Sequence, residues 1–395
     1  MPKTELEFEG LKALGERLAR FEAEDRRRAL RVFDSLEGVL LRTKDGHELV
    51  DFSGNDYLGL ANHPSLLNAA KNALERGEGS TTSSRLIRGS FSPQEVLENA
   101  LCDFLQCPKA LVYNSGYQAN LGLLSALIQR HDAVLMDRLC HASLLDGVQL
   151  SGAKARRYGH ADYEQLKTML RDTPETVTKW IISETVFSMD GDCADLKRLL
   201  ELSQCYGAWL ILDDAHGVGV YGNTRCSGLW ETLGLLAWPD NVILVGTFSK
   251  ALGSFGAYVA AQPEVIDCLI NQSRSFIYST ALPLSVIAAN QASIDLVQAD
   301  KSHRERLWGN IQLASSLLNR PLHSAILPMV IGDNAETMLV TQALWNAGYF
   351  VQGIRPPTVP EGTSRLRITL SAQHTKSQIE GLFEQLQPYL SQVQG

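Results

Sequence analysis

The sequence predicts an α/β fold in which helices cover both faces of a mostly parallel sheet, followed by a smaller α+β domain. Between about residues 100 and 262, short apolar runs alternate with helical patterns. The runs are rich in Val, Ile and Leu and do not alternate with polar residues, which is typical of strands buried on both faces. Beyond about residue 285, long helices are followed by strands and further helices, which indicates a second unit.

The expected elements follow from these patterns in chain order. Four apolar residues of the N-terminal segment fall at helical spacing: Leu11, Leu14, Leu18 and Phe21. We therefore expect an amphipathic helix that packs on the body of the protein or on a partner subunit. Strands are expected over residues 48–52, 110–113, 133–136, 180–183, 209–212, 242–247 and 257–261. In the C-terminal part we expect helices over 285–297, 304–318, 336–346 and 376–390, and strands over 325–331, 349–352 and 366–370.

The chain divides into three predicted segments. Residues 1–56 are expected to form an N-terminal helix and short strand segment, residues 57–290 the large α/β domain, and residues 291–395 the small C-terminal α+β domain. The composition is that of an ordinary globular protein, with 45% hydrophobic and 20% charged residues, so disorder and coiled coil are disfavoured.

Charge and cysteine content narrow the class of protein further. The net charge of −8 disfavours a nucleic-acid binder, and the basic runs at residues 26–28 and 154–157 are expected to be solvated helix or loop faces. No apolar run approaches the ~18 residues of a membrane span. The N-terminus is too charged for a secretory signal. Seven cysteines without a CxxC pair favour reduced thiols in the cytoplasm.

Polar residues that directly follow the apolar runs are the candidate functional residues, because ligands of open α/β sheets bind beyond the carboxyl ends of the strands. Asp213 follows the run over 209–212, and a carboxylate in that position needs a cationic partner. Lys250 follows the run over 242–247, where a lysine facing a cleft is a candidate Schiff-base nucleophile. Taken singly, each residue has an ordinary explanation as a turn cap or a solvated side chain.

Three further strand ends supply the remaining candidates. Ser115 and Gly116 open a helical run, where free backbone N–H groups suit an anion. His141 follows the run over 133–136, and Glu184 follows that over 180–183. Pyridoxal phosphate requires a lysine, a carboxylate for its pyridine nitrogen, a phosphate cradle and a flat side chain against its ring. The joint occurrence of all four predicts this cofactor more specifically than any single residue.

Two other interpretations of the same region are weaker. Gly217, Gly219 and Gly222 have the spacing of a dinucleotide-binding fingerprint, but Asp-Asp-Ala-His separates them from the strand. A nicotinamide oxidoreductase therefore remains a distant alternative. Asp213, Asp214 and His216 lack the spacing of a metal site, so no metal is expected.

Eight motifs now identify a family resemblance. In chain order they are NDYLGL at 55–60, SGYQAN, RLCHASLLDG, ETVFSMDGD, DDAHGVGV, TFSKALG, YSTALP and RPPTVPEGTSRLRITLSAQH at 355–374. Nearly the whole chain resembles the α-oxoamine synthases, which are fold-type-I pyridoxal phosphate enzymes. RPPTVP resembles the 8-amino-7-oxononanoate synthases more than the glycine-using relatives. The resemblance implies a large domain with a mostly parallel seven-stranded sheet, a smaller C-terminal α+β domain, and a homodimer.

The resemblance also implies roles for individual residues. Lys250 would anchor the cofactor covalently, Asp213 would pair with the pyridine nitrogen, His216 would contact the ring hydroxyl and His141 would stack on the ring. The remaining cofactor contacts implied are Gly116, Tyr117, Glu184, Ser188, Thr247 and, across a dimer interface, Thr280. The substrate contacts implied are Asn55, Arg355, Thr358 and Arg26, with Arg27 and Arg28 as close competitors. Arg355 is favoured for a substrate carboxylate, and Arg367 is either the runner-up or a surface strand residue.

One segment departs from the family pattern. Relatives commonly carry a glycine-rich stretch followed by a histidine, whereas this chain has GSTTSSRLIRGSFSPQEVLE. Thr82 and Ser83 stand where glycines are usual, Arg88 replaces a small residue, and Gln94 replaces the histidine. Because this segment lies near the substrate entrance in relatives, the choice of acyl chain is put in doubt.

The implied reaction joins L-alanine to a pimeloyl thioester, carried by coenzyme A or an acyl carrier protein. It would release carbon dioxide and the free thiol and give 8-amino-7-oxononanoate, in biotin biosynthesis. The nearest alternative is a relative that uses glycine, such as an aminolevulinate synthase or a 2-amino-3-ketobutyrate ligase. A cofactor-free protein that acts through dimerisation is a third interpretation, which the four intact catalytic residues disfavour.

Overall fold

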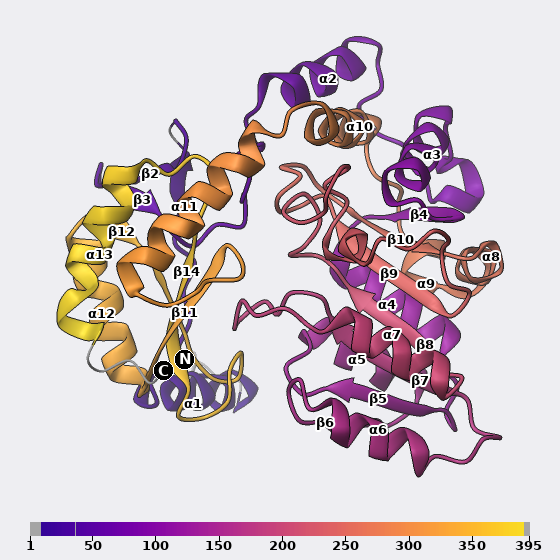
Figure 1. Cartoon of the computed structure of the whole chain (residues 1–395). Coiled ribbons are helices and arrows are strands. Elements are labelled where there is room, and N and C mark those ends of the chain that lie inside the picture. The colour runs from indigo at the N-terminus through magenta and orange to yellow at the C-terminus, as the bar shows by residue number, and fades with distance from the viewer. Residues whose placement is uncertain (1–8, 36, 391–395) are drawn as a thin grey trace, which may run out of the picture.

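The computed structural model describes residues 9–35 and 37–390; residues 1–8, with which the predicted N-terminal segment begins, lie outside them. The chain forms two layered bodies (Figure 1), and helices α2 (Pro64–Glu75) and α10 (Leu284–Ala299) pack against each other where the bodies join. The larger body holds a seven-stranded sheet, and the smaller holds two sheets of three and four strands.

The sheet of the large body confirms the predicted fold class. Its order is β4 (Lys109–Tyr113), β10 (Ala257–Ala261), β9 (Val242–Thr247), β8 (Trp209–Asp213), β7 (Lys179–Glu184), β5 (Ala133–Asp137) and β6 (Ala155–Tyr158). β10 is the one strand of this sheet that runs opposite to the other six. All six strands expected for this sheet are present within two residues of their predicted bounds.

The seventh strand corrects one prediction. The basic run at 154–157 is not a helix or loop face, because residues 155–158 form β6 at the edge of the sheet. Arg156 and Arg157 remain exposed there. Charged side chains are common on edge strands, where they discourage pairing with another sheet.

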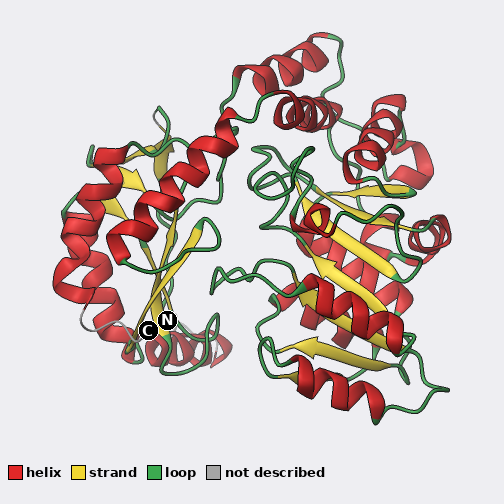
Figure 2. Ribbon diagram, in the orientation of Figure 1, coloured by secondary structure: helices red, strands yellow, loops and turns green. Residues whose placement is uncertain are grey.

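Helices cover both faces of this sheet (Figure 2). On one face pack α4 (Gly116–Leu127), α5 (Ala142–Ser151), α8 (Pro263–Gln272) and the short α9 (Arg274–Ile277). On the other pack α3 (Ser92–Leu105), α6 (Tyr163–Arg171) and α7 (Leu196–Cys205). Each face forms a separate buried apolar cluster, which is why the strands are apolar throughout rather than alternating.

The small body combines both ends of the described chain. Its three-stranded antiparallel sheet has the order β11 (Ile326–Gly332), β14 (Ser364–Thr369) and β13 (Gln352–Ile354). The four-stranded sheet contains β1 (Phe33–Ser35), β2 (Leu40–Thr43), β3 (Glu48–Asp51) and β12 (Tyr349–Phe350), and β12 pairs with β3 in parallel. The strand predicted over 349–352 is therefore two strands in two sheets. The predicted domain boundaries at residues 56 and 290 stay predictions.

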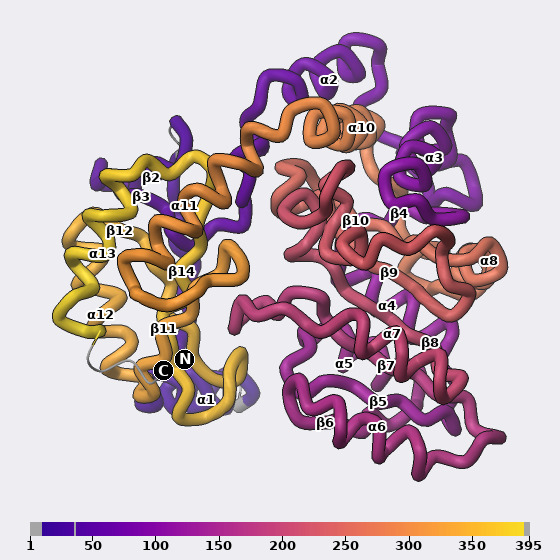
Figure 3. The backbone as a smooth tube through the Cα atoms, in the orientation of Figure 1, coloured from indigo at the N-terminus to yellow at the C-terminus, as the bar shows by residue number. Residues whose placement is uncertain are grey.

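The helices of the small body lie where the periodicity placed them. They are α11 (Ser302–Leu318), α12 (Asn334–Asn346) and α13 (Lys376–Leu390). In the smoothed backbone, α12 and α13 lie on the side of the small body away from the large body, and α11 leads into the small body from the end of α10 (Figure 3). Within the described residues, no helix is both long and apolar enough to cross a membrane. All seven cysteines are free.

The N-terminal helix α1 (Glu9–Ala23) forms as predicted, but its apolar residues are not covered by any of the residues that the structure describes. Leu11, Leu14, Leu18 and Phe21 are between 44% and 67% exposed. Packing of this face on the body of the same chain is therefore wrong, and packing on a partner subunit stays a prediction.

A close backbone contact joins the two bodies. Gly191, with φ +71°, lies so near β11 that a Cβ atom would stand 2.2 Å from the carbonyl oxygen of Ile326. Ser324 Oγ donates a hydrogen bond of 2.6 Å to the Gly191 carbonyl. Only glycine satisfies both the left-handed backbone and the approach.

We expect Gly191→Ala to lower the free energy of unfolding by more than about 2 kcal/mol, because the side chain adds a clash with backbone to the cost of the positive φ. Gly207→Ala is the matched control, since Gly207 has φ +60° and a Cβ added there would have no atom within 4 Å; its loss should stay near 1 kcal/mol. Urea denaturation of the two variants measures the difference, and equal losses would contradict the contact.

Candidate active site

The predicted residues of the large body meet at one edge of its sheet. Parallel strands β5, β7, β8 and β9 end there, so the segments that follow them converge. In the strand register Glu184 lies opposite Asp213, at the ends of β7 and β8. This edge faces the small body (Figure 1).

Lys250 and His216 are in direct contact at this edge. Lys250 Nζ lies 2.8 Å from His216 Nε2. Burial lowers the pKa of Lys250 to about 8, although Asp213 and Glu184 raise it. Burial also lowers the pKa of His216 well below its usual value, helped by the positive charges of Lys250 and Arg367, so the imidazole is neutral.

Asp213 is held by two hydrogen bonds. Asn120 Nδ2 donates to its Oδ2 at 2.8 Å, and the Ala215 N–H donates to its Oδ1 at 3.0 Å. Asn120 is buried and also donates to Ser143 Oγ at 2.9 Å. Sequence reasoning missed Asn120, which is the last residue of the SGYQAN motif. Its position on α4, one turn into the helix, fixes the direction of the carboxylate.

The carboxyl group of Glu184 accepts hydrogen bonds from the backbone of two neighbouring loops. Its Oε1 accepts a hydrogen bond from the His141 N–H at 2.6 Å, and its Oε2 accepts one from the Ser188 N–H at 3.1 Å. Burial and the nearby charge of Asp213 raise the pKa of Glu184 to about 8. The residue therefore orients the segments that carry His141 and Ser188.

His141 caps the start of α5, and its Nε2 has no hydrogen-bond partner among the described residues. Its Nδ1 lies 2.8 Å from Ser143 Oγ and accepts from the Ser143 N–H at 3.3 Å. The ring lies edge-on to Tyr117, with centroids 6.4 Å apart. His141 and Ser188 line a pocket of about 580 Å³ together with residues 357–360, which belong to the RPPTVP motif.

The predicted phosphate end lies at the N-terminus of α4. Ser115 caps this helix, since its Oγ accepts from the Gln118 N–H at 3.2 Å. A Cβ at Gly116 would have no atom within 4 Å, so space is open at this helix start. Tyr117 is exposed, and its hydroxyl donates to Asp146. Asn114 Nδ2 donates to the Thr280 carbonyl at 2.7 Å, which places Thr280 near the same helix end within one chain.

Thr247 is buried at the end of β9 and is fully engaged with backbone. Its Oγ1 donates to the Gly256 carbonyl at 2.8 Å and accepts from the Ser249 N–H at 3.1 Å. These bonds fix the turn that leads to Lys250. The predicted role of Thr247 toward a phosphate stays a prediction.

The candidate substrate residues separate into two groups. In the first group, the arginines near the N-terminus contact the segment of the RPPTVP motif. Arg28 Nη2 donates to Thr358 Oγ1 at 2.9 Å, and Arg355 donates to the Asp25 carbonyl. Arg26 forms ion pairs with Glu24 and Glu361. Asn55 is in neither contact: its Oδ1 accepts two hydrogen bonds of 3.2 Å from Arg367.

Arg367 is buried on β14, so its interpretation as a surface strand residue is wrong. Its Nε donates to the Ser188 carbonyl at 2.6 Å. The guanidinium therefore joins Asn55 to the loop that follows β7. No periodicity distinguishes Arg367 from an exposed strand residue, because the whole of β14 is buried.

Tyr57 is a second residue that sequence reasoning missed. Its hydroxyl oxygen lies 2.7 Å from His216 Nδ1 and 3.0 Å from Asn55 Oδ1. The NDYLGL motif contains Tyr57, but the contact with His216 spans 159 residues of chain and leaves no local signal.

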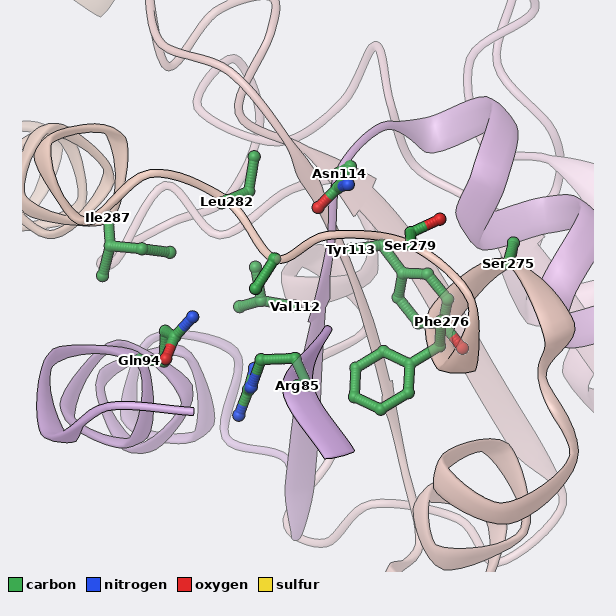
Figure 4. A pocket seen from close by; sticks show the side chains of 11 residues that line it. Arg85, Gln94, Val112, Tyr113, Asn114, Ser275, Phe276, Ser279, Leu282 and Ile287 are labelled. Atoms are coloured by element: carbon green, nitrogen blue, oxygen red, sulfur yellow. The ribbon is translucent and has the colours of Figure 1, made fainter. Parts of the chain in front are cut away.

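The segment that departs from the family pattern is held by contacts within the chain (Figure 4). Gln94 is buried; its Oε1 accepts from the Phe91 N–H at 2.6 Å, and its Nε2 donates to the Gly89 carbonyl at 3.0 Å. Arg85 donates two hydrogen bonds to Glu98, at 2.9 and 3.1 Å. The pocket between Arg85, Gln94 and Phe276 has about 10 Å³ of room, which is enough for a single water.

Thr82 shows why glycine is usual in this segment. Its φ is +54°, in the left-handed region that side chains disfavour. The side chain of Arg88 is exposed. The backbone of Ser83 is held in place, because its carbonyl accepts a hydrogen bond from the Ala281 N–H at 2.9 Å. The effect of this segment on the choice of acyl chain stays a prediction.

Comparison with known proteins gives consistent relatives over nearly the whole chain. The family model of class I and II aminotransferases matches residues 47–386. The 8-amino-7-oxononanoate synthase of Methylococcus capsulatus is 44% identical, over 93% of this chain and 96% of that protein. The enzyme of the same name from Citrifermentans bemidjiense is 43% identical, over 95% of this chain and 98% of that protein.

Solved structures agree with this assignment. The serine palmitoyltransferase of Sphingomonas wittichii superposes with a TM-score of 0.89 at 29% identity, covering 99% of this chain and all of that chain. The 8-amino-7-oxononanoate synthase of Francisella tularensis superposes with a TM-score of 0.75 at 27% identity, covering 87% of this chain and 98% of that chain. With these identities over nearly the full length of both chains, the chain belongs to the 8-amino-7-oxononanoate synthases within the class I and II aminotransferase family.

Proposed function

We propose that this chain condenses L-alanine with a pimeloyl thioester of coenzyme A or an acyl carrier protein. The products are 8-amino-7-oxononanoate, carbon dioxide and the free thiol, and the reaction belongs to biotin biosynthesis. The observation that carries the proposal is the contact of Lys250 with His216 at the strand ends of the large sheet, where the carboxylate of Asp213 also lies.

The residues present fit pyridoxal phosphate. Lys250 offers an amine whose pKa burial lowers to about 8, which favours reaction with an aldehyde near neutral pH. Asp213 offers a fixed carboxylate for the pyridine nitrogen, and the start of α4 at Gly116 offers free N–H groups and open space for a phosphate. When bound, this cofactor withdraws electrons from the α-carbon of an amino acid and so favours loss of the proton there.

Three side chains carry the proton transfers and the binding of oxygen. Lys250 removes the α-proton of alanine, because its amine is neutral in a larger fraction of molecules than that of an exposed lysine. His141 donates a hydrogen bond from Nε2, which its contacts with Ser143 leave free, to the oxygen of the keto acid that forms. Glu184 keeps His141 in place through the His141 N–H.

Arg367 is the proposed partner of the alanine carboxylate. It is buried next to Asn55 and to the loop of Ser188, whereas Arg355 is turned to the Asp25 carbonyl. A guanidinium has five N–H donors, and Arg367 keeps one on Nη1 for a carboxylate beside its contacts with Ser188, Asn55 and Tyr57. The pocket of about 580 Å³ that begins at His141 and Ser188 is the proposed site of the acyl chain.

The active form is proposed to be a cytoplasmic homodimer. Residues 9–35 and 37–390 of a single chain leave the apolar face of α1 uncovered, and a second copy is the partner that would bury it. The seven free cysteines support a reducing compartment, which cell fractionation tests. Light scattering tests the dimer: we expect twice the chain mass of 43.5 kDa, and a monomer would contradict the proposal.

The reaction itself is tested with purified protein, pyridoxal phosphate, L-alanine and pimeloyl-coenzyme A, with products read by mass spectrometry. We expect 8-amino-7-oxononanoate from the wild type and none from Lys250→Ala. His141→Phe should retain activity reduced about 10²–10⁴-fold, because it removes the positioned donor and keeps a flat ring. Full activity of Lys250→Ala, or product from glycine rather than alanine, would refute the proposal.

The two candidate arginines make separable predictions. Arg367→Lys should raise KM for alanine about tenfold or more, because the ammonium of a lysine does not reproduce the planar set of donors that meets Asn55, Ser188 and the carboxylate together. Arg355→Lys should leave KM for alanine unchanged. Steady-state kinetics at varied alanine concentration measures both KM values. A larger rise in KM for Arg355→Lys than for Arg367→Lys would show that Arg355, and not Arg367, binds the alanine carboxylate.

A further inference from the structure

A continuous hydrogen-bonded chain of side chains leads from Lys250 to Arg367. Lys250 Nζ contacts His216 Nε2 at 2.8 Å, and His216 Nδ1 contacts the Tyr57 hydroxyl at 2.7 Å. The Tyr57 hydroxyl contacts Asn55 Oδ1 at 3.0 Å. Arg367 reaches both ends of that last contact, since Nη2 lies 3.4 Å from the Tyr57 oxygen and 3.2 Å from Asn55 Oδ1.

The direction of these hydrogen bonds is fixed at the arginine end. Arg367 can only donate, so the Asn55 atom that meets both of its terminal nitrogens is an acceptor oxygen. The contact between that oxygen and Tyr57 then requires the single hydroxyl proton of Tyr57. Because the Tyr57 hydroxyl donates its single hydrogen to Asn55, its oxygen can only accept a hydrogen bond from His216.

The remaining ring nitrogen follows from the neutral state of His216. Its Nδ1 carries the proton that it donates to Tyr57, so Nε2 carries a lone pair and faces Lys250. An ammonium at Lys250 donates to that lone pair. Every contact in the chain is satisfied by this one arrangement of protons.

Water has little access to disturb this arrangement. Tyr57 is 1% exposed, Arg367 6% and His216 7%. The charged and titratable groups that face His216 are Lys250, Arg367 and His141, and a positive charge on any of them disfavours a second proton on the ring. Tyr221 is the other titratable group near Tyr57, and burial keeps its hydroxyl protonated by raising its pKa.

We propose that Tyr57 is a positioning residue that fixes the tautomer of His216, with the proton on Nδ1 and a lone pair on Nε2 toward Lys250. Arg367 and Asn55 impose this state through the Tyr57 hydroxyl. The Tyr57 side chain thereby joins Arg367, the proposed partner of the alanine carboxylate, to His216, whose Nε2 faces Lys250. This inference rests on the proposed function only for its kinetic consequence, because the hydrogen-bond directions follow from the contacts alone.

Tyr57→Phe tests the proposal, because it removes the hydroxyl and keeps the ring. Tyr258→Phe is the matched control: Tyr258 is also fully buried, and its hydroxyl has no hydrogen-bond partner among the described residues. Each protein is loaded with pyridoxal phosphate, and its visible absorbance is recorded against pH. Kinetics with alanine and the melting temperature are measured on the same samples.

In Tyr57→Phe we expect the midpoint of the absorbance titration to shift by about one pH unit, since His216 is released to place its proton on either nitrogen. The kcat should fall about tenfold, the loss typical of one buried hydrogen bond to a working group. Tyr258→Phe should match the wild type in titration and kcat. An unchanged titration in Tyr57→Phe, with only a lower melting temperature, would overturn the proposal.

Asn55→Ala keeps the proposal testable if Tyr57→Phe does not fold. Removal of the acceptor oxygen frees the Tyr57 proton for His216 Nδ1, so the titration midpoint should move as it does in Tyr57→Phe. A wild-type midpoint in Asn55→Ala overturns the proposal. Absence of 8-amino-7-oxononanoate with the wild type refutes the proposed function, while the absorbance titrations still decide the role of Tyr57.

Discussion

The burial of a lysine together with two carboxylates at one sheet edge is the constraint on which this structure depends. Glu184 and Asp213 are buried and Lys250 is half-buried. Burial keeps Glu184 protonated at neutral pH by raising its pKa to about 8, whereas the charges of Asp213 and Lys250 are tolerated because they compensate each other and directed hydrogen bonds hold the carboxylate. Asn120, Ala215 and the N–H groups of His141 and Ser188 supply those bonds. The same loss of hydration lowers the pKa of the lysine and so makes it reactive.

The sheet and its charged edge could be predicted because both leave local patterns. A strand buried on both faces is a short apolar run, and a polar residue directly after it marks the carboxyl end. β6 was wrongly interpreted because an edge strand needs no apolar run, and its two arginines resemble a solvated loop. The pairing of β3 with β12 was not predicted because two-residue strands carry no periodicity.

The side chains that organise the site were harder to find than those that react. Tyr57, Asn120 and Arg367 owe their roles to contacts with residues far away in the chain, so their immediate neighbours contain no signal. The family motifs include all three, yet a motif does not say which of its members faces the site. The segment over 80–94 is the opposite case, because a residue that departs from the family motif has a role that its near neighbours explain. Gln94 replaces a histidine and caps the start of α3.

The parallel pairing of β3 with β12 has a consequence for synthesis of the chain. The two strands are separated by roughly 300 residues, and at ~10 residues per second the ribosome needs about half a minute to make that stretch. During this time the large body can fold, while the edge of β3 that pairs with β12 remains uncovered. The first strands to leave the ribosome are thus among the last to be completed, and the nascent chain has to be kept from pairing with its neighbours on the same messenger RNA.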